Sequence, residues 1–156
     1  MGKLNLNYDK TLKLTNAVIK EVAEEDFDDM SLTVEKLENY IKSKGYTPIG
    51  PLIQYSGIKT NENGEIDIVI KLIRQSSNYI NHSDEQYKCE SILRIKNCMY
   101  VRYIGPESLL GFSYDKIKLT AFEEDINLKG DSYTVFVNQI DDDIVADVFM
   151  ERSEDE

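Results

Sequence analysis

The residue with the clearest chemical potential is Asp147, a carboxylate inside the otherwise apolar stretch 144–149. Because side chains alternate along a strand, Asp147 shares a face with Val145 and Phe149. A carboxylate on such a face is costly when it is buried without a partner, so it must meet an internal base or hydroxyl, or a cationic ligand. The alternative is a solvent-exposed face, with Ala146, Val148 and Met150 directed toward the core.

Tyrosine is the second conspicuous residue type, with ten tyrosines and no tryptophan in 156 residues. Tyrosine rings suit a pocket for flat or cationic ligands, because they stack and make cation–π contacts. The alternative is that most of these rings complete a mixed core and that their hydroxyls reach solvent.

Side chains for other chemistry are sparse. Cys89 and Cys98 have an odd separation on one predicted strand, so they point to opposite faces and cannot readily form a disulfide. No histidine–cysteine cluster has metal-ligand spacing, and no glycine-rich phosphate loop or nucleophile–base pattern is present. We therefore expect no catalytic residues, no metal and no cofactor.

Charge and hydropathy argue against a nucleic-acid-binding protein and against a membrane-spanning one. The formal net charge is −11 and the pI is about 4.6, which disfavours binding to a nucleic-acid backbone. No apolar run approaches the ~18 residues of a membrane span, and the first residues lack the apolar stretch of a signal peptide. We expect a reduced, cytoplasmic protein that binds neither nucleic acid nor membrane. The sequence does not define its oligomeric state.

The chain reads as one pattern written twice. Residues 12–19 and 93–100 match position by position in apolar and basic character, and Asn16 matches Asn97. Both segments alternate and are rich in strand-forming residues. In the first copy a helical pattern at 31–45 follows, and then strand patterns at 52–55 and 66–72. Ser31 is expected to cap this helix, and its apolar stripe is Leu32, Leu37, Tyr40 and Ile41. In the second copy a helical pattern at 106–125 is followed by strand patterns at 133–137 and 144–150, and the apolar stripe of this helix is Leu110, Tyr114, Ile117 and Ala121.

This doubling predicts an α+β fold made of two β-α-β-β repeats related by a pseudo-two-fold axis. The strands should form a curved, mostly antiparallel sheet with two helices packed on it. We expect a single domain over 1–156, divided into repeat one at about 8–74, a linker at about 75–86, repeat two at about 87–150 and an acidic tail at 151–156. The tail should fray.

Three segments in this order and spacing resemble the GyrI-like effector-binding superfamily: Gly50–Tyr55, Tyr100–Pro106 and Ala146–Met150. This superfamily includes the ligand-binding domains of multidrug-responsive activators and stand-alone gyrase-inhibitor-like proteins. The resemblance covers about 12–150, and Asp147 matches the position where the family usually carries glutamate. It implies a bacterial protein whose ligand lies in the cleft between the repeats. Because the first strand pattern begins within the opening dozen residues, we expect a stand-alone protein without a DNA-binding domain.

The main functional hypothesis is a non-enzymatic protein that binds a small organic molecule, perhaps cationic or aromatic. We expect Tyr55 and Phe136 to be equivalent positions of the two repeats that face each other. The predicted ligand-binding residues are Asp147, Tyr55, Phe136, Tyr103 and Tyr114. Two alternatives remain open. The acidic runs suit an adaptor or inhibitor that binds a protein partner, and some members of the resembled superfamily hydrolyse small strained molecules.

Overall fold

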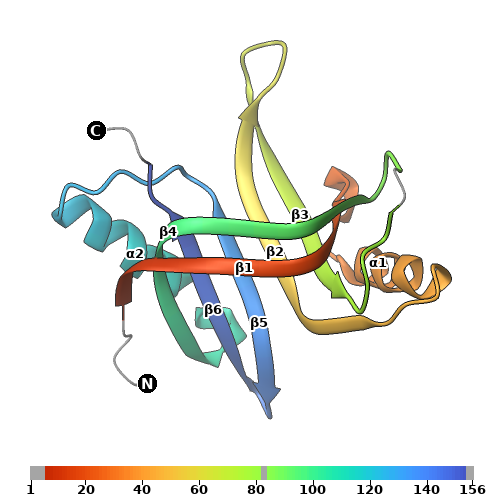
Figure 1. Cartoon of the computed structure of the whole chain (residues 1–156). Helices are drawn as coiled ribbons and strands as arrows, with labels where there is room; N and C mark the ends of the chain where they lie inside the picture. The colour runs from red at the N-terminus through yellow and green to blue at the C-terminus, as the bar shows by residue number, and fades with distance from the viewer. Residues whose placement is uncertain (1–5, 82–83, 154–156) are drawn as a thin grey trace. The chain divides into compact units, whose positions relative to one another are not determined.

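The computed structural model describes residues 6–81 and 84–153, and its helices and strands are labelled in Figure 1. Every strand and helix expected from the sequence is present, and the fold class is α+β with antiparallel strands, as predicted. In chain order the elements are β1 (Leu6–Glu21), η1 (Glu24–Asp26), α1 (Ser31–Ser43), β2 (Pro48–Thr60), β3 (Ile66–Ser76), β4 (Lys88–Pro106), η2 (Glu107–Leu109), α2 (Gly111–Glu123), β5 (Ser132–Ile140) and β6 (Asp143–Glu151).

The chain forms two compact units. Unit 1 takes Met1–Leu12 and Ile95–Glu156, and unit 2 takes Lys13–Arg94. The long strands β1 and β4 therefore each contribute residues to both units. Each unit holds one α-helix and one antiparallel hairpin, β2–β3 in unit 2 and β5–β6 in unit 1. No helix of the described residues is long and apolar enough to cross a membrane.

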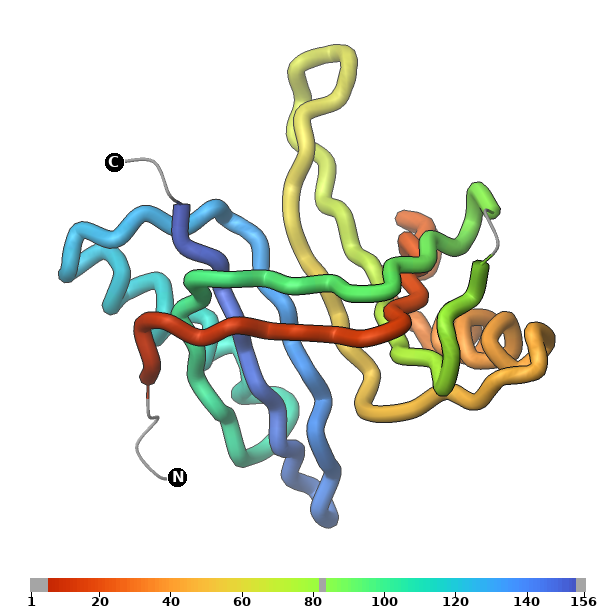
Figure 2. Tube along the Cα trace, viewed as in Figure 1, coloured from red at the N-terminus to blue at the C-terminus, as the bar shows by residue number. Residues whose placement is uncertain are grey.

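In unit 2, β3 pairs with β1 on one side and with β2 on the other. Helix α1 packs on one face of these strands and buries Leu37 and Ile41 against Val18 and Leu72. The hairpin β2–β3 continues as a two-stranded ribbon away from α1, as the trace in Figure 2 shows. Its far end exposes the apolar side chains of Ile58, Ile66 and Ile68.

In unit 1, β6 lies between β4 and β5, and α2 packs against one face of this sheet (Figure 1). The fully buried Ile117 of α2 meets Val101 of β4 and Val148 of β6 in the core. Alternation along β6 places Ala146 and Met150 on the same side as Val148, as the sequence alternative proposed. Asp147 therefore lies on the opposite face of the sheet.

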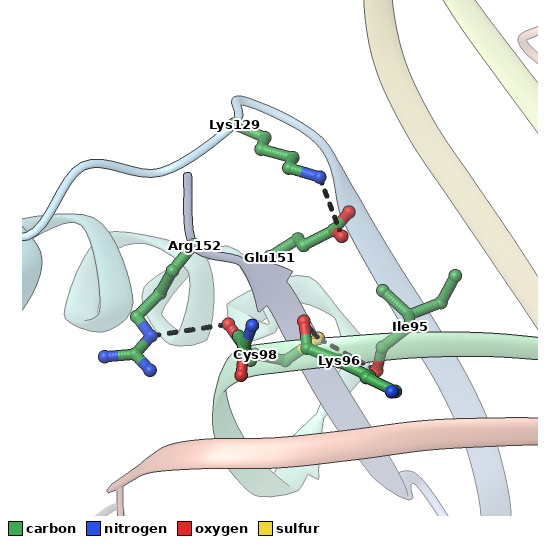
Figure 3. A network of polar contacts seen from close by, with 7 residues as sticks. Ile95, Lys96, Cys98, Lys129, Glu151 and Arg152 are labelled. Atoms are coloured by element: carbon green, nitrogen blue, oxygen red, sulfur yellow. Dashed lines mark hydrogen bonds and ion pairs between the residues drawn. The ribbon is translucent and has the colours of Figure 1, made fainter. Parts of the chain in front are cut away.

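The matched segments of the two repeats share an unusual backbone feature. Asn16 and Asn97 both adopt positive φ, at 52° and 58°, which asparagine tolerates better than most residues. In unit 1 this bend is tied to the end of β6, because the backbone N–H of Arg152 donates to the Asn97 carbonyl at 3.0 Å. Figure 3 shows this network, including the ion pair between Lys129 Nζ and Glu151 Oε2 at 2.9 Å.

Several local predictions were wrong in detail. Leu32, expected in the core stripe of the first helix, is exposed, and Thr33 is buried in its place. Ser31 does not cap α1 but begins it, and its backbone N–H donates to Asp29 Oδ1 at 3.1 Å. Gln75 and Ser76 of the expected linker complete β3. The expected tail is ordered in its first part, since Glu151 ends β6 and Arg152 bridges to Leu128, whereas 154–156 lie outside the described residues.

Gly105 is a position where only glycine fits, and Gly111 provides a matched control. Gly105 has φ +156°, and a Cβ there would lie 2.7 Å from the hydroxyl oxygen of the buried Tyr103. We expect Gly105→Ala to lower the free energy of unfolding by about 1–3 kcal/mol. Gly111, at the start of α2, has open space around it, so Gly111→Ala should leave stability unchanged or raise it by up to ~1 kcal/mol.

Urea denaturation followed by circular dichroism measures both changes. Equal stability of the two variants would show that Tyr103 does not occupy the space beside Gly105.

Candidate functional site

The face of the unit 1 sheet that points away from α2 carries two neighbouring rows of side chains. In the first row, Phe149 of β6 lies opposite Tyr133 of β5 and Tyr100 of β4. In the second row, Asp147 lies opposite Val135 and Arg102. Directly opposed residues of an antiparallel pair point to the same side of the sheet. The two rows therefore bring aromatic rings beside a carboxylate and a guanidinium, and we call this side of the sheet the Tyr100 face. Phe149 and Val135 are buried there.

Asp147 is satisfied by a hydroxyl and a guanidinium. Its Oδ1 accepts hydrogen bonds from the Tyr100 hydroxyl and from Arg102 Nε, both at 2.8 Å, and its Oδ2 accepts one from Arg102 Nη2 at 3.0 Å. The Asp147 side chain is 14% exposed, whereas that of Arg102 is 50% exposed. The carboxylate is thus held in the sheet, while the guanidinium paired with it can reach solvent.

Tyr100 joins the carboxylate to an aromatic surface. Its ring centroid lies 4.9 Å from that of Phe149, with the two planes tilted by 47°. The ammonium of Lys10, from the first part of β1, lies 5.2 Å from the centroid of the same ring. This distance is within the ≈6 Å range of a cation–π contact. The ring of Tyr100 therefore already accepts a cation supplied by the chain itself.

The surroundings of Tyr100 keep its hydroxyl protonated. Burial, together with the hydrogen bond to the negatively charged Asp147, raises the pKa of Tyr100 to about 12. The same carboxylate raises the pKa of Arg102 through its hydrogen bonds and its charge. At neutral pH the three side chains therefore carry one negative and one positive charge, and the phenol is a hydrogen-bond donor.

This electrostatic arrangement predicts that Tyr100 ionises at an unusually high pH. Because the folded pKa of Tyr100 is above its ordinary value of 10, its contribution to stability is complete below pH ~10 and is lost as pH rises to about 12. In Asp147→Asn the pKa of Tyr100 should fall toward 10. The absorbance of ionised tyrosine, measured against Tyr100→Phe in each background, isolates this group. A Tyr100 that ionises at the same pH in both proteins would contradict the assignment of Asp147 as its acceptor.

The structure does not bring the five predicted ligand residues together. Tyr103 is fully buried on the α2 side of the sheet, where its hydroxyl donates to the Pro106 carbonyl. Phe136 packs on the same α2-side core, and Tyr114 of α2 shares a hydrogen bond with Thr134 there. These three aromatic residues therefore lie across the sheet from Asp147.

The fifth candidate, Tyr55, belongs to unit 2, and the expectation that it is equivalent to Phe136 was off by one residue. Ile19 and Tyr100 are matched positions, and along their ladders Ile53 and Tyr133 occupy corresponding places. Tyr55 then corresponds to Val135. Since a one-residue slip moves a side chain to the other face, Phe136 lies on the core side.

The row that corresponds to Asp147 and Arg102 has the opposite charges in unit 2. There Lys71 of β3 lies opposite Glu21 of β1 and Tyr55 of β2. The Lys71 ammonium is 5.4 Å from the Tyr55 ring centroid. The position that carries the acid in unit 1 thus carries a base in unit 2, so only unit 1 places a carboxylate there.

Sequence reasoning missed the role of Tyr100 and Arg102. Both residues belong to the quoted segment Tyr100–Pro106, and their two-residue spacing places them on one face of a strand. This two-residue spacing could be recognised in the sequence. The missing information was the register of β4 against β6, which joins residues 45 and 47 positions apart.

Unit 2 contains a separate pocket of about 440 Å³. Its walls include two tyrosines and two carboxylates, and the lining residues are Tyr79, Asn81, Asp84, Glu85, Tyr87, Lys88 and Cys89. Both faces of the Tyr87 ring are taken, because Tyr40 stacks on it at 3.9 Å and the Lys20 ammonium lies 4.7 Å from its centroid. The Tyr87 ring thus contacts an aromatic side chain and a lysine of the chain itself, as the Tyr100 ring does, and Tyr79 of this pocket is 41% exposed.

The cysteines are unsuited to nucleophilic chemistry. Cys98 is fully buried and its thiol points to the carbonyls of Ile95 and Lys96 at 3.6 and 3.8 Å (Figure 3). Burial raises the pKa of Cys98 to about 12 and also raises the pKa of Cys89. The thiolate is the reactive form, so the surroundings of neither cysteine activate its thiol at neutral pH. Among residues 6–81 and 84–153, no group of three or more metal-ligating side chains comes together.

Solved structures show what the chain is similar to. A hydrolase from Listeria innocua aligns with a TM-score of 0.61 and 10% identity, over 93% of this chain and 91% of that chain. The EcmrR C-terminal domain aligns with a TM-score of 0.59 and 12% identity, over 94% and 98%. SAV2435 bound to tetraphenylphosphonium aligns with a TM-score of 0.54 and 6% identity, over 94% of each chain.

This likeness shows the fold. It is consistent with the GyrI-like fold that the sequence resemblance implied. No family model and no curated protein sequence matches the chain.

Proposed function

We propose that this protein binds small organic cations that carry aromatic groups, and that it does so at the Tyr100 face without changing them chemically. One observation carries the proposal. The Tyr100 ring lies against Phe149, donates its hydroxyl to the partly buried Asp147 and already holds the Lys10 ammonium over its face. A carboxylate beside an aromatic ring is the pair of groups that attracts such a ligand, through charge and through cation–π contact.

Binding requires the ligand to replace the chain's own cations. Lys10 is exposed, and half of the Arg102 side chain reaches solvent, so both can move aside at small cost. An incoming cation then takes the place of Lys10 over the ring and of Arg102 beside Asp147. The ligand's apolar groups are removed from water against Phe149 and Tyr100, which contributes roughly 25 cal/mol per Å².

The fold supports the same class of function. SAV2435, which has this fold, is bound to tetraphenylphosphonium, an organic cation with four aromatic rings. The hydrolase from Listeria innocua has the fold as well, but 10% identity extends no activity to this chain. In the Tyr100 face the high pKa of Tyr100 favours a neutral donor over a base or nucleophile, which suits binding better than catalysis.

Calorimetric titration with tetraphenylphosphonium tests the proposal, with triphenylphosphine oxide as a neutral aromatic control. We expect the cation to bind and the neutral compound to bind at least tenfold more weakly. Removing the competing internal cations should tighten binding of the cation. We expect about 2- to 5-fold for Lys10→Gln, from the loss of one exposed cation–π contact, and about 3- to 10-fold for Arg102→Gln.

These increases distinguish the Tyr100 face from any other site. Lys71→Gln removes the corresponding cation–π contact in unit 2 and should leave the affinity unchanged. Weaker binding in both Lys10→Gln and Arg102→Gln, or equal binding of the neutral compound, would refute the proposal.

A further inference from the structure

Helix α2 carries an apolar stripe on the side that faces away from its sheet. The buried side of α2 is formed by Ser113, Ile117 and Ala121. On the other side, Phe112, Leu119 and Phe122 are 55%, 58% and 81% exposed. Their spacing of seven and three residues places all three side chains along one line of the helix. We call these three residues the α2 stripe.

The other repeat shows that the fold does not need an apolar side chain at two of these three positions. Only the position of Phe112 is also apolar in the other repeat, where it is the exposed Leu32. Helix α1 has the same length as α2, and its buried Thr33, Leu37 and Ile41 correspond to the buried residues of α2. At the positions of Leu119 and Phe122, α1 has the exposed polar residues Asn39 and Lys42. A helix packed on a sheet in this way is therefore stable with polar side chains there, and the exposed leucine and phenylalanine of α2 need another explanation.

The charges at the end of α2 are also reversed with respect to α1. Helix α1 has Lys42 in its last turn and is followed by Lys44, and these cations suit the negative end of a helix dipole. Helix α2 ends at Glu123, is followed by Glu124 and Asp125, and has no basic residue in its last turn. The C-terminal end of the stripe is thus both apolar and strongly negative.

We propose that the α2 stripe is a docking surface for a basic amphipathic segment of a partner protein. The apolar side of such a segment covers Leu119 and Phe122. Its lysines and arginines supply the cations that the C-terminal end of α2 lacks, next to Glu123 and Asp125. A second copy of this chain fits less well, because each copy carries a net charge of −11 and the same acidic helix end. This surface lies on the far side of α2 from the sheet, so it is distinct from the Tyr100 face.

The probe is a fluorescein-labelled 14-residue peptide of leucine and lysine with helical periodicity, and binding is followed by anisotropy at low salt. We expect saturable binding that weakens as salt is raised. The double variant Leu119→Asn and Phe122→Lys gives α2 the residues of α1 and should weaken binding at least tenfold. Glu123→Gln with Asp125→Asn should weaken it about 3- to 10-fold and reduce its salt dependence. Glu124 is left in place because it accepts a hydrogen bond from the Tyr8 hydroxyl.

The hairpin β2–β3 offers a matched control, because Ile58 and Ile68 are both 62% exposed and lie opposite each other. Ile58→Thr with Ile68→Thr should leave peptide binding unchanged. Each variant is first shown to be folded by its circular dichroism and its urea midpoint. Both α2 variants should also bind tetraphenylphosphonium like the parent.

Four results would overturn the proposal: no binding at about 100 μM protein, equal binding by the α2 double variant, equal binding of a leucine–glutamate peptide of the same periodicity, or an equal loss in the hairpin control. Sedimentation tests whether a second copy of this chain occupies the α2 stripe. A dimer of the parent that becomes a monomer in the double variant would assign the stripe to a second copy instead.

Discussion

Replacing Asp147 with asparagine is expected to weaken the binding of tetraphenylphosphonium by about 10- to 150-fold, with neutral aromatic compounds nearly unaffected. The variant keeps the shape of the side chain and removes its charge. A charge-assisted contact in such a setting contributes about 1.5–3 kcal/mol, which corresponds to this range of affinity. Arg102 would also lose its counter-charge and repel the ligand. Calorimetric titration of the parent and the variant measures the change.

The matched control is Asp67→Asn in β3, which removes a carboxylate of unit 2 that accepts weak hydrogen bonds from Asn61. It should leave affinity unchanged. Asp147→Asn should itself remain folded and lose about 1 kcal/mol of unfolding free energy, since Arg102 is half exposed and can be solvated. A folded Asp147→Asn that binds the cation as well as the parent would leave Asp147 with a structural role only.

Replacing Ile117 with alanine is expected to lower the free energy of unfolding by about 2–5 kcal/mol. Ile117 is fully buried between α2 and the β4–β6 sheet, and its removal leaves a cavity beside Val101 and Val148. Leu37→Ala in α1 should have a similar effect, because Leu37 occupies the corresponding buried position. Urea denaturation followed by circular dichroism gives both values.

Leu119→Ala is the matched control on the same helix. Its side chain is more than half exposed, so we expect a change of less than ~1 kcal/mol. Equal losses for Ile117→Ala and Leu119→Ala would mean that α2 does not pack by the face that carries Ile117, and the α2 stripe would lose its basis.

Most of the fold was predictable because the same sequence pattern occurs twice in the chain. Alternation identified the strands, and the match of 12–19 with 93–100 placed Asn16 and Asn97 at corresponding positions, where both adopt positive φ. The core stripe of the second helix was also predicted, since Leu110, Ile117 and Ala121 are buried. Errors occurred at helix ends. There, side chains such as Asp29 compete for the first N–H groups, and no periodicity marks the outcome.

The site was only half predictable. Alternation assigned Asp147 to the face opposite Ala146 and Val148, and the structure agrees. The partners of Asp147 depend on the register between strands. That register joins β4 to β6 through pairings of residues 45 and 47 positions apart, which local alternation does not specify. The correspondence of Tyr55 was missed because the second repeat is one residue shorter before its helix. Asn16 and Asn97 are 81 positions apart, whereas the buried helix residues Leu37 and Ile117 are 80 apart.

The charge reversal between the units restricts the proposed cation site to unit 1. Lys71 and Glu21 stand in unit 2 where Asp147 and Arg102 stand in unit 1. The ladder thus tolerates either polarity, and structural need alone does not select the carboxylate on β6. Attraction of a cationic ligand is one explanation for a carboxylate at position 147 of β6.

The most direct test of this account is a titration of the isotope-labelled protein with tetraphenylphosphonium followed by NMR. The account predicts that the largest, saturable shifts occur at Tyr100, Arg102, Asp147 and Phe149, with Lys10 also affected. In Asp147→Asn these shifts should need at least tenfold more ligand to saturate. Shifts that instead concentrate on Tyr79, Tyr87 and Cys89, or the absence of saturable shifts at millimolar ligand, would contradict it.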